Sequence, residues 1–255
     1  MRIILIKYPQ SKLDTLPLHT AFPPDHELGL TQKGIDNAEL LGKNLASSLN
    51  GRFSVWCGSA LRTAETADIV AKHVGAKPQS DLRLDERKLF SGSSAVTVGD
   101  FRLRQERAYI DPIRLALDED ESPVSHRLRV EAWLAERLGR SNSDEILIVV
   151  SHGAVVEHLH SALSWKPAGA MVASFAFCAP AHGHVWGAVN LPDDRRIFCC
   201  LGANVRLADT VASSTALQGL DDLDSLAVEL ASDPRFQQNR PPDPAVAMVS
   251  KYYIR

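Results

Sequence analysis

The residues best suited to chemistry follow two short apolar runs of the sequence. Lys7, Tyr8 and Gln10 come after the run at residues 3–6, and His152 follows a second apolar run. In open α/β sheets the ligand crevice lies beyond the carboxyl ends of such strands, so we expect these side chains to lie near one another. They could bind an anion and transfer protons. An ordinary polar turn after the first run is the alternative interpretation.

Arg62 is a candidate anion ligand because of its place in a predicted helix. Apolar residues at helical spacing predict a helix over residues 61–74, and Gly75 ends it. A cation in the first turn of a helix opposes the helix dipole and gains nothing locally. A bound anion would explain Arg62, and a solvated arginine is the alternative.

The elements that must position these residues alternate between strands and helices. Residues 3–6 predict a buried, central, parallel strand that ends before Pro9, and residues 12–27 predict a loop beyond it. Thr31 is a candidate N-cap for a helix that closes at Gly51. The remaining predictions are helices at 121–138 and 154–163 and strands at 53–57, 146–150 and 171–178, with two more strands within 184–201.

Composition limits the classes of function. The chain has 255 residues, 45% of them hydrophobic and 23% charged, and a formal net charge of −3. That charge predicts no broad attraction to nucleic acid or to anionic membranes. The apolar runs are too short to cross a bilayer, and residues 1–10 lack the long apolar segment of a signal peptide. We therefore expect a cytoplasmic protein.

Cysteine and histidine spacing gives no sign of a disulfide framework or a metal site. The four cysteines contain no C-x-x-C pair, which indicates reduced thiols. His182 and His184 could face one side of a strand, but no third ligand is evident. We expect neither a metal nor another cofactor.

Two regions stand apart from this alternation. Residues 79–120 are charged and irregular, which predicts a lid or cap insertion, or else a solvated flank. Residues 208–255 change in character and predict a C-terminal extension that packs on the core or on a partner. We expect the main α/β domain to span residues 1–207, and a homo-oligomer stays open.

Five short segments together resemble motifs of the histidine phosphatase superfamily, which includes the cofactor-dependent phosphoglycerate mutases. The resemblance spans about residues 1–207 and implies a doubly wound, mostly parallel α/β sheet with helices on both faces. It also implies a phosphate pocket at the strand ends. The matching segments are residues 30–34, 62–67, 83–87 and 149–153, and the pair Glu121–Ser122 with Arg129–Val130.

The resemblance also implies roles for particular residues. Arg62, Glu86 and His152 stand where the family has its second arginine, its proton-donating acid and its second histidine. The first strand of the family ends in Arg-His-Gly-Gln-Ser, and its histidine is the nucleophile. This chain has Lys7, Tyr8, Pro9, Gln10 and Ser11 there.

The departure at the first strand predicts that phosphohistidine chemistry is lost. Lys7 lacks the bidentate guanidinium fork, and Pro9 withholds a backbone N–H. Tyr8 could be an inert replacement, an acid or base whose phenolate is favoured by the cations Lys7 and Arg62, or a covalent nucleophile.

We expect a repurposed enzyme that acts on a small phosphate- or carboxylate-bearing molecule. Tyr8, Glu86 and His152 would be catalytic. Lys7, Gln10, Ser11 and Arg62 would bind substrate, and a protonated His152 would add positive charge. The alternatives are an inactive pseudophosphatase with a binding or regulatory role, and a residual phosphatase with another nucleophile.

Overall fold

A seven-stranded mixed sheet forms the centre of the part of the chain that the structure describes. This computed structural model describes residues 1–24, 27–88, 96–103, 121–140, 144–163, 181–190, 196–209 and 247–250. The strand order is β3-β2-β4-β1-β5-β6-β7. The strands are β1 (Arg2–Lys7), β2 (Arg52–Cys57), β3 (Pro78–Ser80), β4 (Glu145–Ser151), β5 (His182–Asn190), β6 (Arg196–Arg206) and β7 (Ala247–Ser250).

The central position predicted for β1 is confirmed, but its pairing is parallel on one side only. β1 runs parallel to β4 and antiparallel to β5. The sheet as a whole is mostly parallel, because only the β1–β5 and β5–β6 pairs among the described strands are antiparallel.

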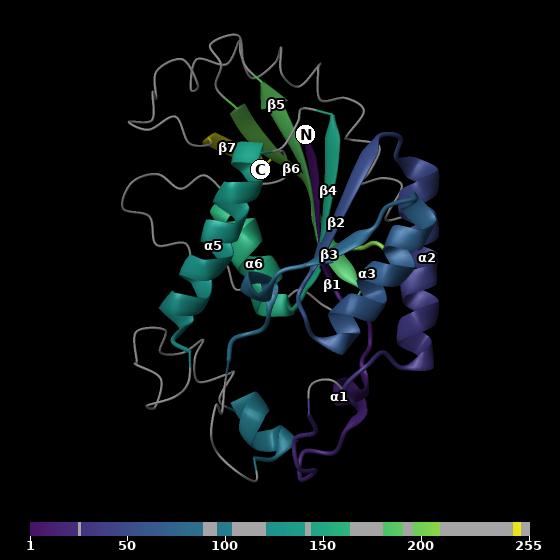
Figure 1. Cartoon of the computed structure of the whole chain (residues 1–255), viewed down its shortest axis with the longest axis vertical. Coiled ribbons are helices and arrows are strands. Elements are labelled where there is room, and N and C mark those ends of the chain that lie inside the picture. The colour runs from purple at the N-terminus through teal and green to yellow at the C-terminus, as the bar shows by residue number, and fades with distance from the viewer. Residues whose placement is uncertain are drawn as a thin grey trace.

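Helices cover both faces of the sheet, with α2 and α3 on one side and α5 and α6 on the other (Figure 1). The helices are α1 (Lys12–Thr15), α2 (Gln32–Ser48), α3 (Leu61–Val74), α5 (Pro123–Arg140) and α6 (Gly153–Leu163), with the 3-10 helix η2 at Leu82–Leu84. The alternation of β1 explains the two layers. Ile4 and Ile6 belong to the core beneath α2 and α3, whereas Ile3 and Leu5 belong to the core beneath α5 and α6.

Local sequence accounts for the ends of the first two long helices. The Thr31 side chain accepts a hydrogen bond from the Gly34 backbone N–H at 3.1 Å, so α2 begins at Gln32 as predicted. Gly75 ends α3 with a φ of 68°, in the left-handed region that glycine adopts without strain.

The region predicted as a loop over residues 12–27 contains one helical turn. Ser11 and Asp14 form a capping box at the start of α1. The prolines around this segment make a loop the simpler prediction from the sequence. Leu13 and Leu28 then pack with Val98 and Phe101 in a small apolar cluster apart from the two main cores. Two of the elements that carry it, α1 and the helical segment at residues 98–103, lie in the lower part of Figure 1, beyond the strand ends.

The predicted cap and extension are only partly described. Within residues 79–120 the structure gives the end of β3, η2 and a helical segment at residues 98–103. Within 208–255, β7 adds to the sheet by pairing in parallel with β6. The strand predicted at residues 171–178 lies outside the described residues.

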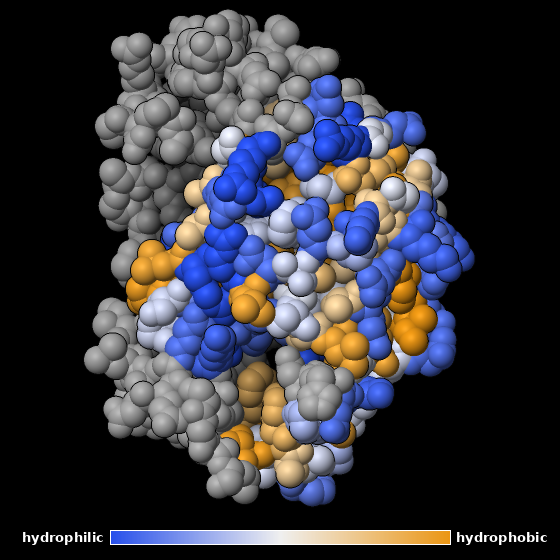
Figure 2. All heavy atoms as spheres, viewed as in Figure 1, coloured by the Kyte–Doolittle hydropathy of each residue, from blue (hydrophilic) through white to orange (hydrophobic). Residues whose placement is uncertain are grey.

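The visible face of the molecule is largely polar. Figure 2 shows hydrophilic side chains over much of α5 and around α2, with smaller apolar patches between them. A hollow lies above the part of the chain that contains α1 and residues 98–103. Among the described helices, none combines the length and apolar character needed to cross a membrane.

Candidate functional site

The ends of β1 and β4 place Tyr8 beside His152. Lys7 is opposite Ser151 in the parallel ladder, and the Tyr8 backbone N–H donates to the Ser151 carbonyl at 3.1 Å. One residue beyond that pair, the Tyr8 and His152 rings meet edge to face with their centroids 5.4 Å apart. The strand-end argument therefore predicts their proximity correctly.

Arg62 lies within the same group, and the alternative of a solvated arginine is wrong. Only 2% of Arg62 is exposed. Its Nη2 lies 3.4 Å from His152 Nδ1, and its Cζ lies 5.2 Å from the Tyr8 ring centroid. Lys7 approaches the same ring, with Nζ 5.9 Å from the centroid.

Glu86 completes the cluster from the segment that follows η2. Its Oε2 lies 3.7 Å from His152 Nδ1, and 17% of its side chain is exposed. The structure thus brings together Lys7, Tyr8, Arg62, Glu86 and His152, which are distant in the sequence.

Burial controls the protonation of this cluster. It raises the pKa of Tyr8 to about 12, although the charge and hydrogen bond of Arg62 oppose this shift. Burial also raises the pKa of Glu86, against the opposing effects of the Arg87 N–H and of Arg62. Tyr8 therefore stays a protonated phenol at neutral pH. Arg62 favours the phenolate, as the sequence predicts, but burial has the larger effect on the Tyr8 pKa.

His152 is neutral in this setting. Burial and the positive charge of Arg62 lower its pKa well below the usual value for histidine. The expectation that a protonated His152 adds positive charge is therefore wrong, and Lys7 and Arg62 are the cations that remain in the predicted set.

Gln10 and Ser11 make hydrogen bonds within the fold. The Thr31 hydroxyl donates to Gln10 Oε1 at 3.0 Å. The Ser11 hydroxyl and backbone N–H donate to Asp14 Oδ2 at 2.9 and 2.7 Å. These contacts hold the chain after β1 in place, and a direct role of either side chain with a substrate stays a prediction.

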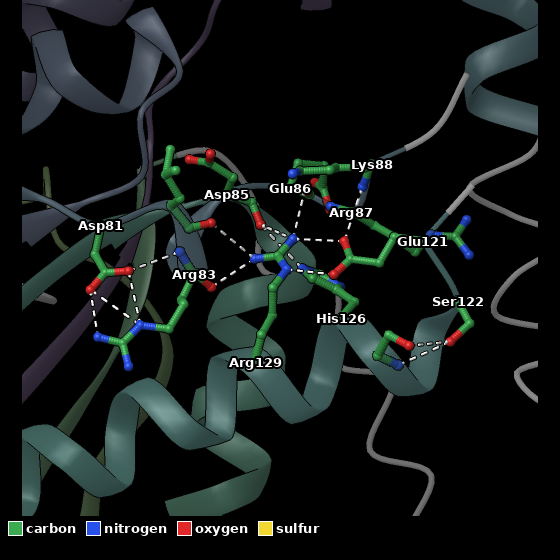
Figure 3. A network of polar contacts seen from close by, with 12 residues as sticks. Asp81, Arg83, Asp85, Glu86, Arg87, Lys88, Glu121, Ser122, His126 and Arg129 are labelled. Carbon is green, nitrogen blue, oxygen red and sulfur yellow. Dashed lines mark hydrogen bonds and ion pairs between the residues drawn. The ribbon is translucent and has the colours of Figure 1, made fainter. Parts of the chain in front are cut away.

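The sequence analysis did not identify the network around Arg129 as part of the functional site. Figure 3 shows Arg129 of α5 surrounded by the backbone of residues 82–86, with Glu121 and His126 beside it. The His126 ring Nε2 lies 3.2 Å from the Asp85 carbonyl oxygen. The Glu121–Ser122 and Arg129–Val130 pattern is the sequence signal that could have found this network.

The described residues contain no cluster of three or more histidine, cysteine, aspartate or glutamate side chains able to hold a metal ion. Cys57 and Cys200 are buried. The Tyr8, Glu86 and His152 side chains offer proton-transfer groups beside the cations Lys7 and Arg62.

Comparison with known proteins agrees with this geometry. A sequence model described as the histidine phosphatase superfamily (branch 1) matches residues 18–175. The match begins after the Lys7–Ser11 segment. A search of curated proteins found no similar sequence.

Solved structures, among them two phosphatases, share the fold. The complex of mycobacterial glucosyl-3-phosphoglycerate phosphatase with inorganic phosphate is 16% identical, covers 82% of this chain and 99% of its own, and has a TM-score of 0.62. The α-ribazole phosphatase from Shigella flexneri is 22% identical, covers 74% and 91%, and has a TM-score of 0.58. Bacillus stearothermophilus YhfR is 20% identical, covers 72% and 90%, and has a TM-score of 0.56.

Proposed function

This chain belongs to the histidine phosphatase superfamily, and we propose that it is a repurposed enzyme of that fold that acts on a small anionic metabolite by acid–base chemistry. The observation that carries the proposal is the Glu86–His152 pair. The two groups lie 3.7 Å apart, and their surroundings raise the pKa of Glu86 and lower that of His152. A carboxyl and an imidazole shifted toward each other can act as general acid and general base near neutral pH.

Phosphoryl transfer through a phosphohistidine is absent from the proposed function. Tyr8 follows the end of β1 at Lys7, where the family has its nucleophile, and a pKa of about 12 keeps its phenol protonated. A protonated phenol is a poor nucleophile but a good hydrogen-bond donor. Tyr8 would therefore orient or protonate the substrate.

The substrate would carry a phosphate or a carboxylate. Lys7 and Arg62 supply positive charge beside Tyr8. The backbone N–H groups at the start of α6, directly after His152, would also attract an anion. Gln10 and Ser11 would support this binding by fixing the backbone after β1. Hydrolysis, elimination and rearrangement all fit this set of groups.

A second candidate is a pseudophosphatase that binds a ligand without turnover. Its supporting observation is burial, since Tyr8, Arg62 and His152 are 6%, 2% and 1% exposed. In that case residues 208–255 would contact a partner protein. A cytoplasmic location and the absence of a nucleic-acid partner are further proposals that rest on composition.

Turnover in isotopically labelled water tests the two candidates against each other. The protein is incubated with pools of phosphate- and carboxylate-bearing metabolites in D₂O or H₂¹⁸O, and mass spectrometry detects label gained by any metabolite. Glu86→Gln and His152→Gln should each lower the rate at least about 100-fold, because each removes a proton-transfer group. Arg127→Lys is the control, since Arg127 is 47% exposed and pairs with Glu131 on the outside of α5.

Two results would contradict the acid–base enzyme. Ligand binding detected by calorimetry with no label incorporation in any metabolite would favour the pseudophosphatase. Hydrolysis of phosphate monoesters with a phosphoryl adduct on Tyr8, detected by mass spectrometry and absent in Tyr8→Phe, would instead make Tyr8 a nucleophile, and both candidates would be wrong.

A further inference from the structure

The Arg129 guanidinium binds the backbone of the segment that carries Glu86. Nη1 donates to the carbonyls of Arg83 at 2.7 Å and Leu82 at 3.3 Å. Nη2 donates to the carbonyls of Asp85 at 2.9 Å and Glu86 at 3.0 Å (Figure 3). Arg129 therefore donates hydrogen bonds to four of the five backbone carbonyls of residues 82–86, including that of Glu86 itself.

Glu121 holds this guanidinium from the other side. Its Oε1 accepts from Arg129 Nε at 2.5 Å and its Oε2 accepts from Nη2 at 2.8 Å. Only 19% of the Arg129 side chain and 14% of the Glu121 side chain are exposed, so the pair is well shielded from water. Glu121 also exchanges hydrogen bonds with Lys88, through its backbone N–H at 2.8 Å and its carboxylate at 3.1 Å. The ion pair thus hydrogen-bonds to the backbone both before Glu86, at Arg83 and Asp85, and after it, at Lys88.

The opposite side of the segment is attached to the strand ends. The Ser151 hydroxyl donates to the Leu84 carbonyl at 2.6 Å, and the Asp85 carboxylate accepts from the backbone N–H and hydroxyl of Ser59. Gly58 leaves room for this contact, because a Cβ there would lie 2.7 Å from the Leu84 oxygen. The segment is fixed between α5 and the residues that precede α3 and His152.

We propose that Arg129 is a positioning residue, which acts with Glu121 to hold the Glu86 carboxyl against His152. Arg129 hydrogen-bonds to the backbone of residues 82–86, so its hold on Glu86 is through the backbone, and its charge is also one of the effects that lower the pKa of His152. The importance of this geometry for catalysis rests on the proposed function, whereas the geometry itself can be tested without a substrate.

The shape of the arginine side chain is essential to this role. A planar guanidinium offers five N–H groups in a fixed fork, and Arg129 directs them to six acceptors, four carbonyls and the two Glu121 carboxylate oxygens, so that an Nη2 N–H is shared between two of them. A lysine keeps the charge but offers a single ammonium group, so Arg129→Lys should free several carbonyls and let the segment move. A role that depended on charge alone would survive this change.

A double-mutant cycle measured by NMR tests the proposal. The probe is the set of ring ¹³C and ¹⁵N chemical shifts of His152 at neutral pH. Replacing Glu86 by glutamine should change these shifts in the wild-type protein, because Glu86 Oε2 lies 3.7 Å from Nδ1. In the Arg129→Lys background that change should fall to less than about half, whereas in the matched Arg127→Lys background on the same helix it should be unchanged.

The cycle separates positioning from a general effect on stability. Loss of stability alone lowers the melting temperature but leaves the effect of Glu86→Gln on His152 intact in the folded protein. A folded Arg129→Lys protein with the full Glu86 effect refutes the proposal. Glu121→Gln is a second variant, which keeps the four carbonyl contacts and is expected to fold with a reduced Glu86 effect. If Arg129→Lys does not fold, a full Glu86 effect in Glu121→Gln refutes the proposal.

The outcomes also distinguish this proposal from the proposed function. If Glu86→Gln leaves His152 unchanged in the wild-type protein, there is no contact to position and both ideas are wrong. If the positioning is confirmed but the labelled-water experiment finds no turnover, the role of Arg129 is supported and the proposed enzymatic function is wrong.

Discussion

Acid should destabilise this protein, and His184 gives the clearest case. The His184 side chain on β5 is fully buried, and its ring lies 4.0 Å from that of His160, centroid to centroid. Its Nε2 lies 3.6 Å from Glu157 Oε1 on α6. Burial lowers the pKa of His184 to about 4, which shows that the loss of hydration outweighs the nearby carboxyl.

The sign of the effect follows from proton linkage. An unfolded histidine has a pKa of about 6.5, so below that pH the unfolded chain binds a proton that folded His184 does not. The stability contributed by neutral His184 is complete above about pH 6.5 and is lost as the pH falls toward the folded pKa. The slope is about 1.4 kcal/mol per pH unit, so the loss at pH 5 is about 2 kcal/mol. His126 and His158 act in the same direction, since burial lowers the pKa of His126 to about 3 and that of His158 to about 4.

Urea unfolding followed by circular dichroism measures this loss. The free energy of unfolding at pH 7.5 and at pH 5.0 is compared between wild type and His184→Gln, which cannot titrate. The decrease on acidification should be smaller in His184→Gln by about 2 kcal/mol. The exposed His19→Gln variant is the control, and it should lose stability with acid as the wild type does. An equal decrease in His184→Gln and wild type would refute the reasoning.

Three further predictions concern the site and its supports. Inorganic phosphate should raise the melting temperature beyond the effect of a matched neutral salt, and Arg62→Ala should abolish that increase, because Arg62 is a buried cation of the site. Thr31→Ala should cost about 1 kcal/mol in urea unfolding, since it removes the N-cap of α2, and an unchanged midpoint would contradict the cap. Hydrolysis of a generic phosphate monoester should be measurable only when Lys7→Arg, Tyr8→His and Pro9→Gly are combined. A folded but inactive triple variant would mean that the pocket no longer fits a phosphoryl group.

Local signals predicted the long elements well. Thr31 and Gly75 mark helix ends through hydrogen bonding and backbone conformation within a few residues, and such information is present in the sequence itself. The direction of strand pairing is different. β1 is apolar on both faces whether its neighbour is parallel or antiparallel, so its sequence gave no indication that β5 runs antiparallel to it.

The site could be predicted in position but not in protonation. Tyr8 and His152 follow strands, and the strand-end rule brings them together. The neutrality of His152 could not be predicted, because it depends on burial and on Arg62, which lies 90 residues away in the sequence. Arg129 was overlooked as a functional residue for a similar reason. The Glu121–Ser122 and Arg129–Val130 pattern marks Arg129, but its partners are backbone carbonyls of a distant segment, so the sequence does not show what Arg129 binds.

The charge distribution of the site agrees with the acid–base chemistry that we propose. The contacts bring two cations, Lys7 and Arg62, against a ring that stays uncharged at neutral pH. Beside them the pKa shifts of Glu86 and His152 favour the neutral form of each. Neutral Glu86 can donate a proton to a substrate, which leaves a carboxylate near Arg62, and neutral His152 can accept one, which leaves an imidazolium near Glu86. This is a different task from stabilising a transferring phosphoryl group, which demands concentrated positive charge and a nucleophile. The presence of Tyr8 after β1 and the neutral forms of Glu86 and His152 therefore both support acid–base chemistry as the proposed reaction.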